Sequence, residues 1–150
     1  MTIIATLAFS SVGSKVYLSA GVPATADAAG FGALAYTEIK EVTDLGALGP
    51  ESAVIMHQPV GENVSYKLKG SKNFGQLTLK AARAPTDPGQ LLVVAAEASN
   101  NAYAMKLVLQ NGTIMYAQVL VMSYKTSVGG QSQVVSVDIT MEISGTIITV

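Results

Sequence analysis

Alternation of apolar and polar side chains is the dominant pattern along the chain, and it predicts β-strands rather than helices. The clearest run is 135–143, where Val, Ile and Met alternate with Ser, Asp, Thr and Glu. Segments 63–70 and 76–80 have the same period, and a turn over 72–75 is expected to join them as an antiparallel hairpin. The pattern therefore predicts an all-β core.

The period changes to that of a helix at 87–100. Asp87 is a suitable N-cap, Pro88 suits the first helical position, and Gln90 completes a capping box. The stripe expected to pack against the sheet consists of Leu91, Leu92, Ala95 and Ala96. One helix is thus predicted to flank the strands.

The strongest short turn signal is Asn111-Gly112, because both residues tolerate positive φ. It predicts a hairpin between 103–110 and 113–126. The second of these strands is apolar on both faces, so it must be covered once by the core and once by something else. A short β-prone tail, 144–150, follows the last long strand and carries apolar side chains that need a partner.

Two further segments are predicted to be long loops. Segment 21–36 is rich in Gly, Ala and Pro, and 46–61 is interrupted by Gly and Pro, which indicates a loop or an extended hairpin. With 1–13 as an N-terminal arm, residues 1–150 are expected to form a single domain. The predicted fold class is all-β with one flanking helix, built as a β-sandwich or barrel.

Composition changes this picture in one respect, because charged residues make up only 13% of the chain while 49% is apolar. A typical domain has about 25% charged residues, so part of the surface is expected to contact protein. The net charge of −1 excludes the broad basic field that non-specific nucleic-acid or acidic-membrane binding needs. No apolar run approaches the roughly 20 residues that span a bilayer, so membrane insertion is not expected.

Few residues offer catalytic chemistry. Cysteine is absent, which removes disulfides, thiolate metal sites and cysteine nucleophiles. His57 is the single histidine, and a surface or interface role is favoured over a catalytic one. The acids lack the spacing of known cation-binding loops, so no catalytic, cofactor-binding or metal-binding residue is predicted.

A cluster of lysines invites a second interpretation, as a nucleic-acid patch made of Lys67, Lys69, Lys72 and Lys80 with Tyr66 and Phe74 between them. Period-two alternation directs Tyr66 to the opposite face from Lys67 and Lys69, and the chain has a single arginine. A solvated or inter-subunit lysine face is therefore favoured.

The order of short motifs resembles the major tail tube proteins of long, non-contractile-tailed bacteriophages. The resemblance covers most of the first hundred residues and rests on Gly13-Ser14-Lys15-Val16-Tyr17, Phe31-Gly32-Ala33-Leu34-Ala35-Tyr36-Thr37-Glu38-Ile39, Glu41-Val42-Thr43-Asp44-Leu45-Gly46, Lys69-Gly70-Ser71, Gly75-Gln76-Leu77-Thr78-Leu79 and Asp87-Pro88-Gly89-Gln90-Leu91-Leu92. It implies a non-enzymatic subunit whose sheets join side by side into hexameric rings, and these rings stack into a hollow tube for DNA ejection. It also implies a location in the virion tail after assembly in the host cytoplasm.

The resemblance further implies partners and contact residues. The partners are other copies of the chain, the tail terminator, tape measure and distal tail proteins, and double-stranded DNA that passes without sticking. Candidate lumen-facing residues are Ser136, Asp138, Thr140 and Glu142. Candidate inter-ring and inter-subunit contacts, on arms and loops expected to order on neighbours, are Ile3, Ile4, Leu7, Phe9, Phe31, Leu34, Leu48, Val54, Met56, His57, Ile147 and Val150.

Two alternatives stay open at this point. An inner-tube protein of a related contractile or secretion apparatus would share the same physics and differ in having a sheath outside. A small monomeric β-barrel that binds an apolar ligand would also explain the high aliphatic content and single helix. Rings or tubes of purified protein would favour assembly, whereas a monomer that persists at high concentration would favour the barrel.

Overall fold

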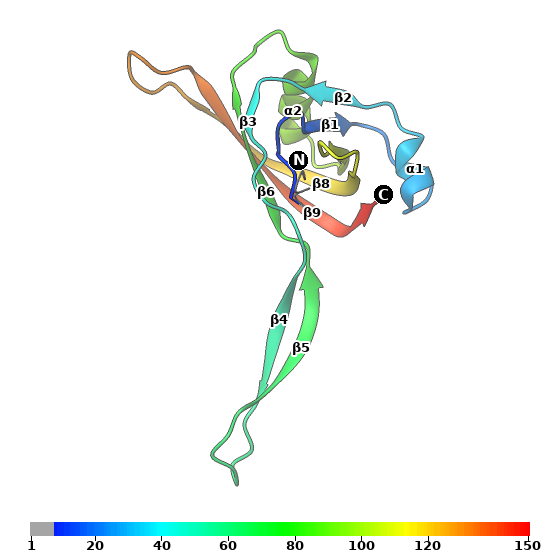
Figure 1. Ribbon diagram of the computed structural model, residues 1–150, viewed down its shortest axis with the longest axis vertical. Helices are drawn as coiled ribbons and strands as arrows, with labels where there is room; N and C mark the ends of the chain where they lie inside the picture. Colours follow the sequence, from blue (N-terminus) through cyan, green and yellow to red (C-terminus); the bar gives the residue numbers. More distant parts are fainter. Residues whose placement is uncertain (1–7) are drawn as a thin grey trace, which may run out of the picture.

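The computed structural model describes residues 8–150 (Figure 1). Strands dominate, as the alternation predicts. The elements in chain order are β1 (Lys15–Ser19), α1 (Ala28–Gly32), β2 (Thr37–Ile39), β3 (Val42–Asp44), β4 (Glu51–His57), β5 (Tyr66–Asn73), β6 (Gln76–Ala82), α2 (Pro88–Ala98), β7 (Tyr103–Val108), β8 (Ile114–Ser127) and β9 (Ser136–Thr149).

Most strands belong to one antiparallel sheet of seven strands in the order β2-β1-β7-β8-β9-β6-β3. Its two edge strands, β2 and β3, are consecutive in the chain and are separated only by Lys40 and Glu41. Glu41 has a left-handed backbone, φ 62°, which turns the chain between β2 and β3. The sheet therefore curls round until its edges lie close together, as an incompletely closed barrel.

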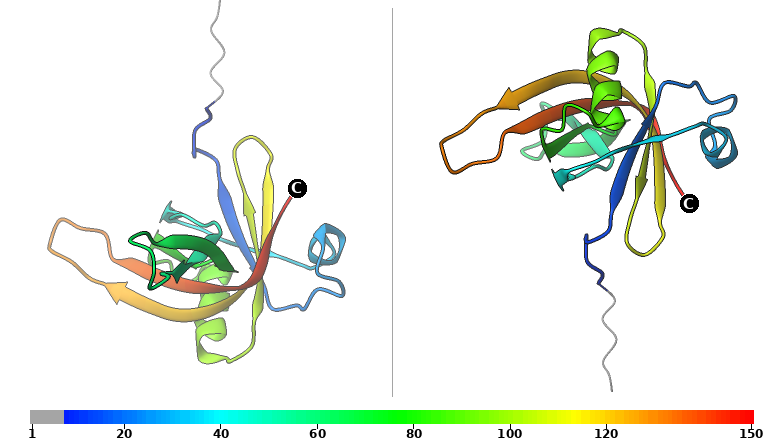
Figure 2. Two further views of the ribbon diagram at one scale, coloured as in Figure 1. Left: turned by 90° about the horizontal axis from the view of Figure 1, so that it is seen from below. Right: turned by 90° about the horizontal axis from the view of Figure 1, so that it is seen from above.

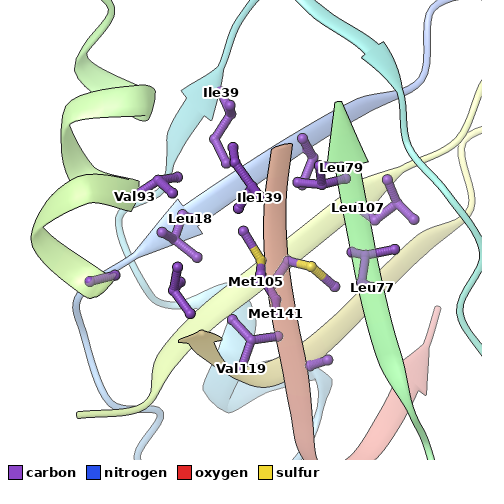
Figure 3. Packing of buried hydrophobic residues seen from close by; sticks show 14 of the residues in the cluster. Leu18, Ile39, Leu77, Leu79, Val93, Met105, Leu107, Val119, Ile139 and Met141 are labelled. Carbon is purple, nitrogen blue, oxygen red and sulfur yellow. The ribbon is translucent and has the colours of Figure 1, made fainter. Parts of the chain in front are cut away.

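The core lies inside this curled sheet (Figure 3). Every second residue of each long strand points inward, and register places these residues opposite one another, for example Leu79 beside Ile139 and Val121 beside Met141. Helix α2 contributes Val93 and Ala96 to the same cluster. Burying this set of apolar side chains is the main force that holds the curled sheet together.

Helix α2 confirms the predicted helix and its N-cap, but the predicted capping box does not form, because the Asp87 N–H donates to the Ala84 carbonyl and not to Gln90. The Asp87 carboxylate accepts from the backbone N–H of Gln90 and, at 3.0 Å, from that of Lys40. The buried face agrees with the predicted stripe in part, because Ala96 is buried and Leu92 packs against the core. It differs at two positions, since Val93 is buried while Leu91 is 55% exposed. A Cβ on Gly89 would collide with the carbonyl oxygen of Glu38, so the helix begins tightly against β2.

The Gln90 side chain links helix α2 to the backbone between β2 and β3 and to the end of β6. Its side-chain amide is buried, and Nε2 donates to the carbonyl oxygens of Ala82 at 2.8 Å and Lys40 at 3.2 Å. Oε1 accepts from the backbone N–H of Ala84 at 2.9 Å. One side chain thus satisfies backbone groups from the link between β2 and β3 and from the end of β6.

Segment 21–36, predicted to be a long loop that orders on neighbouring subunits, folds partly onto its own subunit. It contains α1, which Asp27 caps by accepting from the Gly30 N–H at 2.7 Å. Phe31 stacks on Tyr116 of β8, with ring centroids 5.8 Å apart. The Tyr36 hydroxyl donates to the Phe31 carbonyl, and burial, aided by Tyr116, raises the pKa of Tyr36 to about 12. This small second cluster supplies part of the cover that β8 needs on its outer face.

The predicted C-terminal tail is likewise part of the sheet. Strand β9 continues through Gly145, where φ is +96°, and its end pairs with the start of β8, Ile148 lying opposite Tyr116. The backbones of Ile114 and Val150 exchange hydrogen bonds of 3.2 and 2.8 Å. The apolar tail therefore finds its partner in the same subunit.

One predicted pairing is wrong. Strand β5 pairs with β4, and β6 pairs with β9 and β3, so the hairpin expected between 63–70 and 76–80 does not form. The hairpin of β7 and β8 around Asn111-Gly112 is confirmed, with Gly112 at φ +89°.

Candidate assembly surfaces

The β4–β5 hairpin stands apart from the body of the subunit as a two-stranded sheet (Figure 1). Chain continuity makes it an outward extension of the β3–β6 edge pair. An isolated two-stranded hairpin is at best marginally stable in water. Among residues 8–150, β4 and β5 pair with each other and with no third strand.

Both faces of this hairpin expose large apolar side chains. Register places Ile55 opposite Leu68 and His57 opposite Tyr66 on one face. The other face presents Val54, Met56, Lys67 and Lys69. Val54 is 65% exposed and Leu68 is 61% exposed, although 63–70 was predicted to be half-buried. Apolar area of this kind, gathered on one projecting element, marks a protein contact surface.

The second surface is the outer face of strands β8, β9 and β6, on the opposite side of the sheet from the core. Alternation along β9 points its half-buried polar residues to this side, namely Ser136, Asp138, Thr140 and Glu142. We call this surface the open face. The α1 cluster covers the outer face only over Ala104 of β7, the start of β8 and the end of β9. Helix α1 lies near the C-terminus, at the opposite end from the loop that joins β8 and β9 (Figure 2). All of the candidate lumen residues thus lie together on one surface.

Charge on the open face is mixed rather than purely acidic. Asp138 lies opposite Lys80 of β6 and opposite Lys125 of β8, so it has a cation on each side. Glu142 lies between Gln76 and Leu120 and has no such neighbour in register. The two acids therefore differ in electrostatic surroundings, which the alternation along β9 alone does not reveal.

The predicted contact residues divide into groups. Ile3, Ile4 and Leu7 lie outside the described residues. Phe31 is 4% exposed and its ring belongs to the subunit's own second cluster, which corrects its assignment as a contact residue. Three are partly buried against the subunit's own clusters: Leu34, Leu48 and Ile147. The exposed ones are Phe9, Val54, Met56, His57 and Val150.

Some exposed residues were missed from the sequence. Leu68 was missed because the alternation over 63–70 was interpreted as one buried face opposite a lysine face. Ile55 lies in 46–61, from which only its neighbours Val54, Met56 and His57 were chosen. Leu91 and Val94 of α2 are exposed as well. A helix that is apolar all round signals a second contact, and α2 has that composition.

No metal-binding cluster competes with these surfaces in the described part of the chain. Within residues 8–150, no three His, Asp or Glu side chains gather where a metal ion could bind. The cavities are open, and one of about 480 Å³ lies between 11–14 and 42–46. No helix in the same range is long and apolar enough to cross a membrane.

The family model for phage tail tube protein (TTP) matches residues 24–150. The chain belongs to this family. The match confirms the resemblance and makes this tail tube protein a structural subunit of a phage tail tube. No curated protein sequence matches it.

Solved structures with the same fold come from several tube-forming particles. The tail tube protein aligns with a chain of the anti-feeding prophage baseplate at TM-score 0.72 and 18% identity, over 98% of this chain and 97% of that one. A chain from the sheath/tube terminator of an extracellular contractile injection system gives 0.69 and 11%, over 98% and 99%. The SPP1 tail tube gives 0.65 and 14%, over 91% and 75%. These likenesses confirm the all-β tail tube fold.

Proposed function

We propose that six copies of the chain form a ring, that rings stack into a hollow tube in the virion tail, and that this tube conducts double-stranded DNA into the host. The observation that carries the proposal is the β4–β5 hairpin, whose exposed apolar residues have no cover in the subunit (Figure 1). In a stack, each hairpin lies on a copy in the adjacent ring. The tube's ends would then meet the tail terminator and distal tail proteins, and the tape measure protein would occupy the bore during assembly in the host cytoplasm.

The proposal makes the open face the wall of the bore. The charges of this face balance, because Lys80 and Lys125 flank Asp138 and Glu142 adds an acid without a cation in register, so the face presents no net positive field to DNA phosphates. Charges on a wall act only within a screening length of about 8 Å in physiological salt. A low-adhesion wall is what passage without sticking requires.

Purified protein tests the assembly directly. Size-exclusion chromatography and negative-stain electron microscopy are expected to show rings or tubes with six-fold symmetry and a central bore. A species that remains monomeric as concentration is raised would contradict the proposal and would revive the ligand-binding barrel.

The charge of the bore gives a second test. Replacing Glu142 with Lys puts a ring of cations where no lysine lies in register, and the fraction of particles that eject DNA is expected to fall by about half or more. Glu142→Gln is the control, because it removes charge without adding attraction. Unchanged ejection from Glu142→Lys particles would mean that this face does not line the bore. Asp138→Lys is less informative, since it also sets three cations side by side.

A second candidate role follows from two of the structural neighbours. The injection-system chain and the anti-feeding prophage chain align over 99% and 97% of their lengths, so this subunit has the size of their components. In such an apparatus the tube would lie inside a contractile sheath. Electron microscopy of particles from producing cells distinguishes the roles, because a sheath around the tube is visible only in the second case.

A further inference from the structure

The outward side of helix α2 presents an apolar stripe. Leu91 is 55% exposed and Val94 is 42% exposed, and the exposed Ala95 and Ala98 extend the stripe at helical spacing. The other side of the helix already packs against the core of the subunit. Glu97 is the one charged residue of α2, and it is exposed beside the stripe. The stripe therefore suits a partner that combines apolar side chains with a cation.

One face of the β4–β5 hairpin has this combination. Register places Met56 opposite Lys67 and Val54 opposite Lys69, so two apolar side chains of β4 lie beside two lysines of β5 on the same face. Val54 is 65% exposed and Met56 is 57% exposed. The opposite face, which carries Ile55, has no lysine in register. We call the face with Val54, Met56 and the lysines the lysine face.

A bulge in β5 adds a third lysine to the lysine face. From Val54 to Ser52 the pairing moves two residues along β4 but three along β5, from Lys69 to Lys72. Lys72 therefore lies opposite Ser52, on the same face as Lys69. None of the three lysines forms an ion pair within residues 8–150, and neither does Glu97. These charges are thus available to another molecule.

The positions of the two surfaces fit head-to-tail stacking. Figure 1 shows α2 in the upper part of the body and the hairpin leaving from the lower part. When every ring points the same way, the hairpin of one copy extends toward the end of the next copy at which α2 lies. Apolar side chains that are uncovered on both elements of a single copy are then covered in the stack.

We propose that the lysine face of one copy packs on the α2 stripe of a copy in the adjacent ring, where Glu97 pairs with a lysine of the hairpin. Opposite charge selects this face of the hairpin over the face that carries Ile55. The inference rests on the proposed stacking of rings and names the surface that receives each hairpin. It also gives α2 a second, outward contact in addition to its contact with the core.

Pairs of introduced cysteines test the contact in the full-length chain, which has no cysteine of its own. Val94→Cys is combined in turn with Ser52→Cys, Val54→Cys and Met56→Cys, and assembled tubes are treated with a mild oxidant. At least one pair is expected to give a ladder of disulfide-linked multimers, because two cysteines join when their Cα atoms lie within about 7 Å. Rungs beyond the size of one ring would show that the links cross between rings. Ile55→Cys with Val94→Cys is the matched control and should give about tenfold less multimer, because that side chain lies on the other face.

Charge exchange gives an independent readout. Glu97→Lys is expected to raise the concentration needed for tube formation about tenfold, because attraction becomes repulsion at every contact. One of the second substitutions Lys67→Glu, Lys69→Glu and Lys72→Glu is expected to restore assembly to within about threefold of the wild type, which identifies the lysine that faces Glu97. Lys40→Glu changes an exposed lysine outside both elements and should not rescue. Thermal melting checks that every variant folds.

Assembly of the wild type distinguishes the two ways of failing. Tubes that yield no ladder from any lysine-face pair, or a ladder from the Ile55→Cys pair alone, would overturn the contact with α2 and leave the stack of rings intact. Assembly of Glu97→Lys at the wild-type concentration would overturn its pairing with the hairpin. A wild-type chain that forms no tubes would overturn both proposals.

Discussion

A chain in which the dipeptide Asn-Gly replaces Glu51–Asn73 is expected to fold normally and to form no tubes. The replaced ends already lie together, since Glu51 is paired with Asn73, and Asn-Gly closes a two-residue turn. Burying one Val, Leu or Met side chain contributes about 1.5–3 kcal/mol. Each copy loses several such contacts, so the concentration needed for assembly should rise by at least about 100-fold. Sedimentation velocity and negative-stain microscopy measure this.

Serine substitutions show which face of the hairpin carries the contact. Val54→Ser with Met56→Ser changes the face that bears Lys67 and Lys69, whereas Ile55→Ser with Leu68→Ser changes the other face. Val128→Ser is the matched control, because Val128 is exposed at a loop that is separate from the hairpin. Wild-type assembly by the hairpin-less chain would contradict the role given to this element.

The largest effect on stability is expected from Gln90→Leu. Leucine fills similar space but leaves the carbonyls of Lys40 and Ala82 and the N–H of Ala84 without their side-chain partner. An unsatisfied buried polar group costs about 1–3 kcal/mol, so the variant should lose at least about 3 kcal/mol. For a domain of this size that lowers Tm by about 10 °C. Urea denaturation and calorimetry at a concentration below assembly measure the loss.

Gln118→Leu makes the same chemical change on the outer face of β8, where Gln118 is half-buried. It should alter the free energy of unfolding by less than about 1 kcal/mol. Equal effects from the two variants would show that Gln90 stabilises the fold by packing alone rather than by its hydrogen bonds to the backbone of Lys40, Ala82 and Ala84.

Local signals in the sequence predicted much of the fold. Alternation identified β9, Asn111-Gly112 identified the β7–β8 hairpin, and Asp87 with Gln90 marked the start of α2. These signals work because period, turn chemistry and capping depend on residues close together in the chain. The buried face of α2 was misassigned at Leu91 and Val93. Both side chains are apolar, so composition does not show which of them is buried.

Pairing between distant strands could not be predicted in the same way. Adjacency in sequence favoured a β5–β6 hairpin, but a two-residue break at Phe74-Gly75 lets β6 join β9 while β5 turns outward to β4. Likewise, nothing local reveals that Asp138 has lysines on both sides, because those lysines come from β6 and β8. The candidate lumen residues were predicted from the alternation of β9 alone, whereas the charge balance of the open face depends on residues of β6, β8 and β9.

The β4–β5 hairpin leaves the body of the subunit in a single direction (Figure 1). A stack of rings joined through it is consequently polar: one end presents six hairpins without receivers, and the other presents receivers without hairpins. The two ends should therefore elongate at different rates. Whatever stops growth must recognise one end only, so the length of the tube can be controlled from a single terminus.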